Sequence, residues 1–441
     1  MSEKTLCQHL AEYIVALRPQ ALPRELIEKA KSIVLHNLAI SFGGVGTDQV
    51  NKALELVDSR DGPATLVGQS FKASAAEAAL YNTVAVRALR MEDMAMPSFT
   101  HPGACLVPAA LALGEQRAAS GAEMLAAIAI GYEVIGKVAG SHYTWDTSNR
   151  TPSHIYNALG VAAAASKLMR LDAEQTAGAL AHACNLGALI TEGIQDFQYG
   201  ILTHNGMLAA RLGEVRAPFP VDALEGPHGL YAVQLGGTRP TNEEILGALG
   251  TRHEILSAVL KPHPCTGSNL VPIEILRGIL REHRLKADGI ERVSVIRAVN
   301  YGREIGHHFH GPFTGYLGGM YEATSSLPFA LATLMVDGDI THAHFLNAND
   351  PRIAAVIRRV AIEFADGLGL LDHRVVVKTR DGRAIEAAGG RERLPVPNTA
   401  AILEQYALPI VGAAKVADLQ RTVAQLDAAA SVHALAQCLA I

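Results

Sequence analysis

The sequence predicts a mainly α-helical protein with a smaller α+β portion near its C-terminal end. Of the 441 residues, 49% are hydrophobic but only 5% are aromatic. Ala, Leu, Val and Ile must therefore fill the core, which favours close helix packing over a sheet sandwich. Alternating apolar and polar residues become prominent only after about Pro264. We expect a large all-helical domain from residues 1–265 and 396–441, with an inserted α+β lid domain from residues 266–395.

Helix signals dominate the first part of the chain. Pro23 predicts the start of a helix that Gly43 and Gly44 end. Three capping boxes each precede an apolar stretch: Ser74 with Glu77, Ser120 with Glu123, and Thr241 with Glu244. Three stretches are apolar on nearly every side and predict helices buried between other helices: residues 106–113, 124–138 and 158–168.

The second part of the chain mixes strand and helix patterns. Residues 291–299 and 357–364 resemble strands, and Asp381-Gly382 between two alternating runs predicts a β-hairpin. Helical patterns lie between them, at residues 269–280, 325–336 and 351–357. After a Pro-rich linker at residues 394–397, the Ala-rich tail returns to helical periodicity, so we expect it to pack on the first domain.

Charge and cysteine usage exclude several classes of protein. With 38 basic and 43 acidic residues, the net charge of −5 gives no reason to expect a nucleic acid partner. Five widely spaced cysteines without a C-x-x-C pair argue against a disulfide framework or a zinc site and favour the reducing cytoplasm. No signal peptide is evident, and no apolar run approaches the roughly 18 residues of a membrane span, so we expect no membrane.

The usual motifs for phosphate or zinc binding are missing. The sequence has no G-x-x-x-x-G-K-[ST], no G-x-G-x-x-G after a strand and no H-E-x-x-H. We expect His307, His308 and His310 to lie in a loop, because no carboxylate or Cys follows them at ligand spacing. We therefore expect no nucleotide and no metal.

One polar segment, residues 87–104, interrupts apolar surroundings and could carry chemistry. Arg87 and Arg90 are three residues apart and could share a helix face as a fork for carboxylates. His101 precedes Pro-Gly at a predicted loop-to-helix junction, where it could act as an acid or base. The alternative is an ordinary ion pair between Arg90 and Asp93 next to a loop histidine.

Three further histidine or lysine positions are candidates. His154 and His204 are each predicted near the N-terminal end of a helix, where they could face an anionic ligand or simply cap or fill the core. Lys261 opens the stretch KPHPCTGSN, which includes Ser268, at the expected domain junction, where clefts often form. The alternative there is a stiff linker with solvated charges, and Cys265 is not expected to be a nucleophile.

The order of several segments resembles the MmgE/PrpD family across nearly the whole chain. The segments are ATLVG at 64–68, Tyr81-Asn82, HPGACLVPAALALGE, GYEV at 131–134, ALGVAAAASKLMRLD, HNGMLAAR, LEG at 224–226, KPHPC and EATSSLPFALATLMVDG. The resemblance implies a helical domain with an inserted α+β lid, a cleft between them, a homodimer and no organic cofactor. It also implies that His101 and Lys261 belong to the active site.

The chain departs from the pattern of that family at several site positions. The motif H-A-x-D-F-D-D-T stands here as residues 87–94, with Arg87, Arg90 and Met94 in place of its His, first Asp and Thr. The second lysine of the family falls on Ile201, and the histidine before the buried helix falls nearer Thr151 than His154. These departures change both the proton-transfer groups and the carboxylate clamp, so we expect a different anionic substrate.

The resulting prediction is a cofactor-independent lyase, of the dehydratase or decarboxylase type, that abstracts an α-proton from a small polycarboxylate. His101 would be the acid or base, with Lys261, Asp93, His154 and His204 as the other catalytic groups. Four residues would bind the substrate: Arg87, Arg90, Thr151 and Ser268. The alternatives are an epimerase of a dicarboxylate similar to iminodisuccinate and a non-catalytic, degenerate family member.

Overall fold

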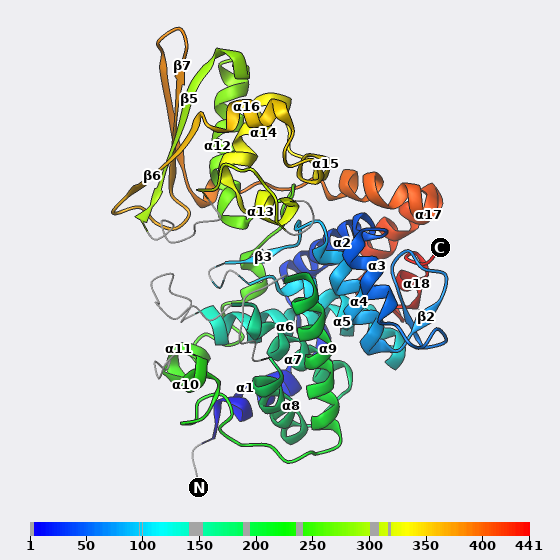
Figure 1. Ribbon diagram of the computed structural model, residues 1–441. Coiled ribbons are helices and arrows are strands. Elements are labelled where there is room, and N and C mark those ends of the chain that lie inside the picture. The colour runs from blue at the N-terminus through cyan, green and yellow to red at the C-terminus, as the bar shows by residue number, and fades with distance from the viewer. Residues whose placement is uncertain are drawn as a thin grey trace. The chain divides into compact units, whose positions relative to one another are not determined.

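The chain folds into two compact units. The computed structural model describes residues 4–96, 98, 100–140, 153–187, 195–234, 241–299, 308–315 and 319–441. The first unit comprises Met1–Leu260 and Asn398–Ile441, and the second unit comprises Lys261–Pro397. Figure 1 shows helices throughout both units, so the prediction of a mainly α-helical protein is confirmed.

The first unit is built from helices packed on helices. Its α-helices are α1 (Leu6–Ala16), α2 (Arg24–Gly44), α3 (Asp48–Glu55), α4 (Ala75–Arg87), α5 (Pro102–Arg117), α6 (Gly121–Gly140), α7 (Asn157–Leu168), α8 (Ala173–Leu186), α9 (Gln195–Glu214), α10 (Leu230–Gln234), α11 (Asn242–Leu246), α17 (Thr399–Ala424) and α18 (His433–Gln437). Short 3-10 turns join them at η1 (Pro19–Ala21), η2 (Ser153–Tyr156), η3 (Glu254–Ser257) and η10 (Leu426–Ala428). Helices α5, α6 and α7 are buried over most of their length, as their apolar, Ala-rich sequences predict.

The helix-start signals of the sequence are confirmed. Helix α2 follows Pro23 and ends at Gly44. In each of the three capping boxes, the Ser or Thr side chain accepts a hydrogen bond from the backbone N–H of the Glu, and the Glu carboxylate accepts one from the cap backbone. These bonds satisfy N–H groups that the first turn of a helix cannot pair internally.

Two pairs of very short strands correct the expectation of an all-helical domain. Strand β1 (Ala64–Thr65) pairs with β2 (Lys72–Ala73), and β3 (Met94–Ala95) pairs with β4 (Ala258–Val259), both antiparallel. Segments of two residues are too short to show an alternating pattern, so no sequence signal marks them. The β3–β4 pair fixes the chain directly after Asp93.

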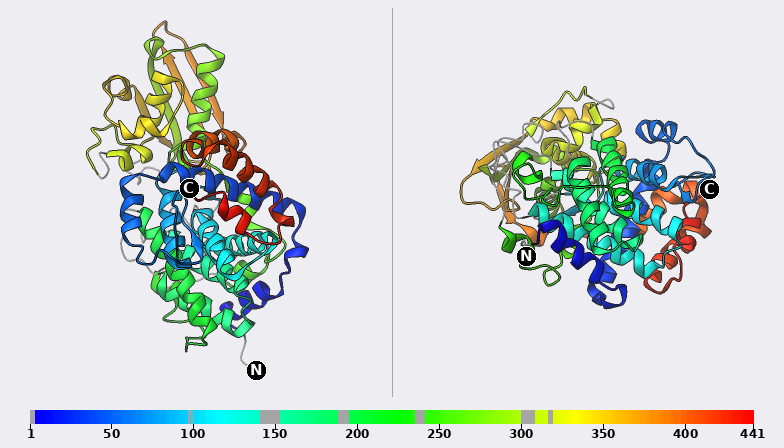
Figure 2. Two further views of the ribbon diagram at one scale, coloured as in Figure 1. Left: turned by 90° about the vertical axis from the view of Figure 1, so that its right-hand side faces the viewer. Right: turned by 90° about the horizontal axis from the view of Figure 1, so that it is seen from below.

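Helix α17 packs along α2 within the first unit. Figure 2 shows the two helices side by side, and Lys31 of α2 donates a hydrogen bond to the Ala424 carbonyl at 2.8 Å. Helix α17 has 26 residues and contains an 18-residue window with a mean hydropathy of 1.2. By length and composition alone it could cross a membrane, which corrects the expectation that no apolar run of this length exists. Pro409 and the non-helical Gly412 interrupt it.

The second unit is a mixed sheet covered by helices. The strand order is β6 (Val360–Ala365), β5 (Ile290–Ala298), β7 (His373–Thr379) and β8 (Ala384–Gly389), with β5 and β6 parallel and the other neighbours antiparallel. Helix α12 (Leu270–Glu282) packs on β7 and β8, α14 (Leu327–Asp337) packs on β6 and α12, and α16 (Pro351–Ile357) packs on α14 (Figure 1). The smaller elements are α13 (Met320–Ser325), α15 (His342–Leu346), η4 (Gly267–Asn269), η5 (Ala287–Gly289) and η9 (Arg391–Arg393).

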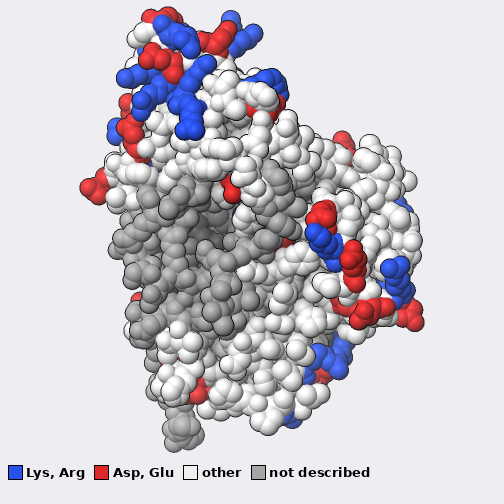
Figure 3. Space-filling view, viewed as in Figure 1, with Lys and Arg blue, Asp and Glu red and all other residues white. Residues whose placement is uncertain are grey.

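The other patterns of the second unit are also confirmed. Asp381-Gly382 forms the turn between β7 and β8, where the Thr379 N–H donates to the Arg383 carbonyl at 2.9 Å. Gly382 has a φ of +88°, the left-handed region in which glycine is favoured. Lys and Arg side chains gather on the surface over the strands (Figure 3), where Arg292, Arg374 and Lys378 are exposed.

Replacing two glycines of the second unit by alanine should have opposite effects on stability. Gly382→Ala should lower the free energy of unfolding by about 1 kcal/mol, because a Cβ strains a left-handed residue. Gly278→Ala should raise it by up to about 1 kcal/mol, because Gly278 lies inside α12 with open space where its Cβ would stand. Urea unfolding of both variants measures the difference, and equal shifts would contradict it.

Candidate active site

The turn that follows α4 determines where the two predicted arginines point. Helix α4 ends at Arg87, and Arg90 has a φ of +54°, outside the helical region. Arg87 and Arg90 therefore do not share a helix face, which corrects that part of the prediction. The cause is a tight turn in which the Arg90 N–H donates to the Arg87 carbonyl at 2.9 Å.

Arg87 is fully buried and lies among acidic and aromatic side chains. Its Nη1 donates to Glu92 Oε1 at 2.5 Å, and its Nε lies 3.9 Å from Asp196 Oδ1 of α9. Its guanidinium carbon lies 4.1 Å from the centre of the Tyr199 ring, a cation–π contact. Burial raises the pKa of Asp196, and Arg87 and Arg90 oppose that rise. These contacts neutralise a charge that would be costly to bury alone.

Asp93 is also fully buried, but it does not pair with Arg90. Its carboxylate accepts hydrogen bonds from Tyr132 Oη at 2.5 Å, Asn37 Nδ2 at 3.2 Å and the Gly103 N–H at 3.2 Å. Burial raises the pKa of Asp93, and these three donors counteract the increase. The predicted ordinary ion pair with Arg90 is therefore replaced by a network that joins α2, α5 and α6.

The close approach of Asp93 to α5 requires a glycine. A Cβ on Gly103 would stand 2.1 Å from Asp93 Oδ1 and 2.7 Å from Asn37 Nδ2. No side chain fits there without displacing the carboxylate. Gly103 thus allows Asp93 to accept a bond from the first turn of α5, where the backbone N–H groups lack helical partners.

His101 is held directly in front of α5. It occupies the N-cap position, and Pro102 is the first helical residue, as the sequence predicted. Its Nδ1 lies 2.7 Å from the Asp93 carbonyl oxygen and 3.4 Å from Glu92 Oε1. A carbonyl only accepts, so Nδ1 carries a proton, and in the neutral ring the lone pair is on Nε2. The side chain is 17% exposed. This arrangement is the one that a general base requires.

His204 is not at the start of a helix. Helix α9 begins at Gln195, so His204 lies in its middle and the predicted helix-end environment is wrong. The glycines on either side of His204 allow close helix packing: a Cβ on Gly206 would stand 2.6 Å from Val161, and one on Gly200 would stand 3.1 Å from Val84. His204 is partly buried, with Nδ1 3.4 Å from Asn205 Oδ1.

The side chains of two other predicted residues are not described. Thr151 lies outside the described residues altogether. His154 lies in η2, directly before α7, and only its place in that turn is described. Their roles remain predictions.

Lys261 and Ser268 belong to the second unit, and both are buried there. Lys261 Nζ donates to the Cys265 carbonyl at 3.4 Å, and Ser268 Oγ has no hydrogen-bond partner in the described part of the chain. Between them, burial lowers the pKa of His263 to about 3, and the positive charge of Arg277 adds to this effect. The segment is therefore packed core and not a solvated linker.

Four residues of the first-unit network were not predicted: Asn37, Tyr132, Asp196 and Tyr199. Asn37 interrupts the apolar face of α2, and Tyr132 is the aromatic residue of GYEV, so each had a weak signal in the sequence. Asp196 had no signal in the sequence, because it lies in the first turn of α9 and belongs to no motif. Among the described residues, no three His, Cys, Asp or Glu side chains gather as metal ligands.

Comparisons with known proteins agree with the resemblance seen in the sequence. Residues 8–243 match the sequence model of the MmgE/PrpD N-terminal domain. A cis-aconitate decarboxylase of Aspergillus terreus is 23% identical over 460 residues, which cover 95% of this chain and 92% of the relative. The mouse cis-aconitate decarboxylase is 25% identical, and the match covers 82% of this chain and 76% of the relative.

A third relative matches over a shorter part. It is the cis-aconitate decarboxylase-like protein oryM of Aspergillus oryzae, which is 25% identical over 302 residues. That match covers 64% of this chain and 63% of the relative, so the chain spans less than two thirds of its length.

A double-mutant cycle should show strong coupling between Arg87 and Glu92. Each of Arg87→Met and Glu92→Gln should cost about 3–5 kcal/mol of unfolding free energy, because each leaves an opposite charge buried. The double variant should cost less than the sum by about 1–3 kcal/mol. The exposed pair Lys52 and Asp48 is the control and should couple by less than about 1 kcal/mol. Additive losses at Arg87 and Glu92 would contradict the assignment.

Acidification should destabilise the protein through His263. The unfolded imidazole takes up a proton near pH 6.5 but the buried one only near pH 3, so its stabilising contribution is lost as pH falls between these values. Between pH 6.5 and 5 the loss should be about 2 kcal/mol. His263→Asn should remove this part of the dependence and leave the part due to His373, because burial lowers the pKa of His373 to about 3 as well. His283→Asn, at an exposed position, should change neither part. Urea unfolding at both pH values measures it, and parallel curves for all three proteins would refute it.

Proposed function

The chain belongs to the MmgE/PrpD family, and we propose that it is a cofactor-independent lyase, of the dehydratase or decarboxylase type, that acts on a small polycarboxylate. The names of its relatives favour the decarboxylase type and a substrate of the cis-aconitate class. The orientation of His101 is the observation that carries the proposal.

His101 would move the proton of the reaction. In a dehydration, Nε2 takes a proton from the carbon next to a carboxylate, and the electron pair expels hydroxide. In a decarboxylation, the carbon–carboxylate bond breaks, CO₂ leaves, and the carbanion takes a proton from the imidazolium. Both steps need one ring nitrogen held by the protein and the other directed at the substrate. The Asp93 carbonyl and Glu92 hold Nδ1, so Nε2 would face the substrate.

The two arginines would have different roles. Arg90 keeps a small exposed fraction, 9%, and we assign it to the substrate carboxylates. Arg87 has no exposed surface and pairs with Glu92, so we expect it to act through Glu92 on His101 and not as a direct clamp. Asp93 would position His101 by fixing both the backbone carbonyl and the first turn of α5.

The remaining predicted residues enter the proposal through the family resemblance. Lys261 and Ser268 would contribute a cation and a hydroxyl to the polycarboxylate, and the burial of an ammonium group at Lys261 supports a specific role. His154, His204 and Thr151 would supply further proton-transfer and binding groups.

The epimerase and the non-catalytic protein are the competing functions. An epimerase needs the same α-proton removal, so the His101 geometry supports it equally. The exposed Ile201, at the position of the second lysine of the family, favours a non-catalytic protein, because that cation is lost. The retained His101 network favours an enzyme.

The assembly and location follow the same reasoning. We propose a homodimer, because Ile201 and Leu208 expose apolar surface seven residues apart on α9. We propose a cytoplasmic location, because all five cysteines are buried and none is in a disulfide.

Proton NMR in deuterated water tests the reaction. The protein is incubated with cis-aconitate and a panel of small di- and tricarboxylates. A decarboxylase should release CO₂ and leave deuterium on the product carbon, whereas a dehydratase should release water and exchange deuterium into the recovered substrate. His101→Ala should lower turnover at least about 10²-fold, because it removes the proton carrier. The exposed His433→Ala is the control and should keep full turnover. Deuterium uptake with inversion and no loss of mass would indicate the epimerase, and no exchange with any compound would refute the lyase.

Arg90→Ala should abolish affinity for the substrate without a comparable loss of stability. Arg170→Ala is a matched control, because Arg170 also has a positive φ, +56°, but its side chain is 77% exposed and pairs with Glu123. Both substitutions carry the same backbone cost, so a difference in KM isolates the side chain. Equal KM values in both variants would show that Arg90 does not bind substrate.

A further inference from the structure

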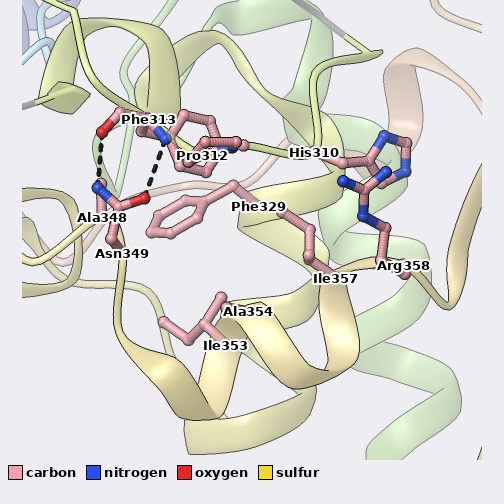
Figure 4. A pocket seen from close by; sticks show the side chains of 11 residues that line it. His310, Pro312, Phe313, Phe329, Ala348, Asn349, Ile353, Ala354, Ile357 and Arg358 are labelled. Atoms are coloured by element: carbon pink, nitrogen blue, oxygen red, sulfur yellow. Dashed lines mark hydrogen bonds between the residues drawn. The ribbon is translucent and has the colours of Figure 1, made fainter.

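A cavity inside the second unit has no role in the proposed reaction. Its volume is about 180 Å³, and Figure 4 shows that its walls come from the loop at residues 310–313, α14 and α16. Phe313, Phe329, Ile353 and Ile357 make it largely apolar. The cavity is open to solvent on one side, where the lining residues Ala354 and Arg358 are exposed, so a small molecule can reach it.

The walls are held in place by contacts among the lining residues and their neighbours. Asn349 clamps Phe313 from both sides: its Oδ1 accepts from the Phe313 N–H at 2.9 Å, and its Nδ2 donates to the Phe313 carbonyl at 2.6 Å (Figure 4). Four phenylalanines form a chain of ring contacts 5.2–5.4 Å between centroids, which runs Phe309, Phe313, Phe329, Phe345. The cavity is therefore preformed, which lowers the cost of binding.

The size corresponds to one small ring. An engineered cavity of about 150 Å³ in another protein, lined by Leu, Ile and Phe, stays dry and binds benzene. The cavity here is slightly larger and lined by similar side chains, so it can accept a six-membered ring with one substituent.

One end of the cavity is cationic. Arg358 and His310 lie next to each other there (Figure 4). Across the part of the chain that is described, the Arg358 guanidinium is exposed and makes no ion pair. His310 Nε2 donates to the Val360 carbonyl at 2.8 Å, which fixes the ring at this end. A carboxylate placed here could form charge-assisted hydrogen bonds with Arg358 while its apolar body fills the cavity.

We propose that this cavity is a binding site for a small apolar monocarboxylate of the size of benzoate. None of the residues that line it is assigned to the lyase reaction, so this proposal does not depend on that one. An apolar tail is required by the phenylalanine and isoleucine walls, and a single negative charge is required by Arg358.

Ligand-observed NMR titration of the full chain with benzoate tests the site. Benzoate should bind saturably, and benzamide, its neutral analogue, should bind at least tenfold more weakly. Arg358→Ala should weaken benzoate at least tenfold and leave benzamide nearly unchanged. Arg292→Ala, at an exposed arginine of β5 outside the cavity, is the control and should bind as the parent protein does.

A cavity-filling pair gives the second measurement. Ala354→Phe should block the cavity and abolish binding of both compounds, and it should fold because Ala354 is exposed on α16. Ala355→Phe, at the neighbouring exposed position that does not line the cavity, should leave binding intact. Absence of saturable benzoate binding, or equal binding by the Ala354→Phe and parent proteins, would overturn the proposal. Loss of turnover in His101→Ala without any change in benzoate binding would show that the two sites are distinct.

Discussion

The burial of the Arg87 guanidinium constrains everything around it. A charge without solvent must be neutralised nearby, and Glu92 at 2.5 Å does so. Because Glu92 is held there, it also lies beside His101 Nδ1. Asp93 is the next residue, so its carboxylate turns to the opposite side, toward Tyr132 and Asn37. One ion pair thus sets the direction of the whole acidic segment between α4 and α5.

The network also links stability and chemistry in the same atoms. The Asp93 side chain holds the first turn of α5 through Gly103, and the Asp93 backbone holds His101. Loosening the network would unfold the helix end and misdirect the imidazole together. The raised pKa values of Asp93 and Asp196 are the electrostatic consequence of this burial.

Much of the fold could be predicted from local chemistry, and the site only in part. Capping boxes, the Asp381-Gly382 turn and the fully apolar helices are encoded within a few residues, so they were predicted. The start of α9 was missed, because glycines that serve helix packing look like helix breaks. The turn at Arg90 was missed, because an arginine with a positive φ has no local sequence signature. The position of His101 at the start of α5 was predicted because its His-Pro-Gly motif is local. The network residues Tyr132 and Asp196 were not predicted, because they come from other helices.

The Arg87–Glu92 pair also constrains substitution at these two positions. The resemblance to the MmgE/PrpD family implies a histidine where this chain has Arg87, whose charge Glu92 neutralises. Introducing that histidine alone would leave a buried carboxylate without its strongest partner, and changing Glu92 alone would leave a buried cation. Each single change therefore gives a less stable protein, so the two positions depend on each other and tolerate replacement best when both change together.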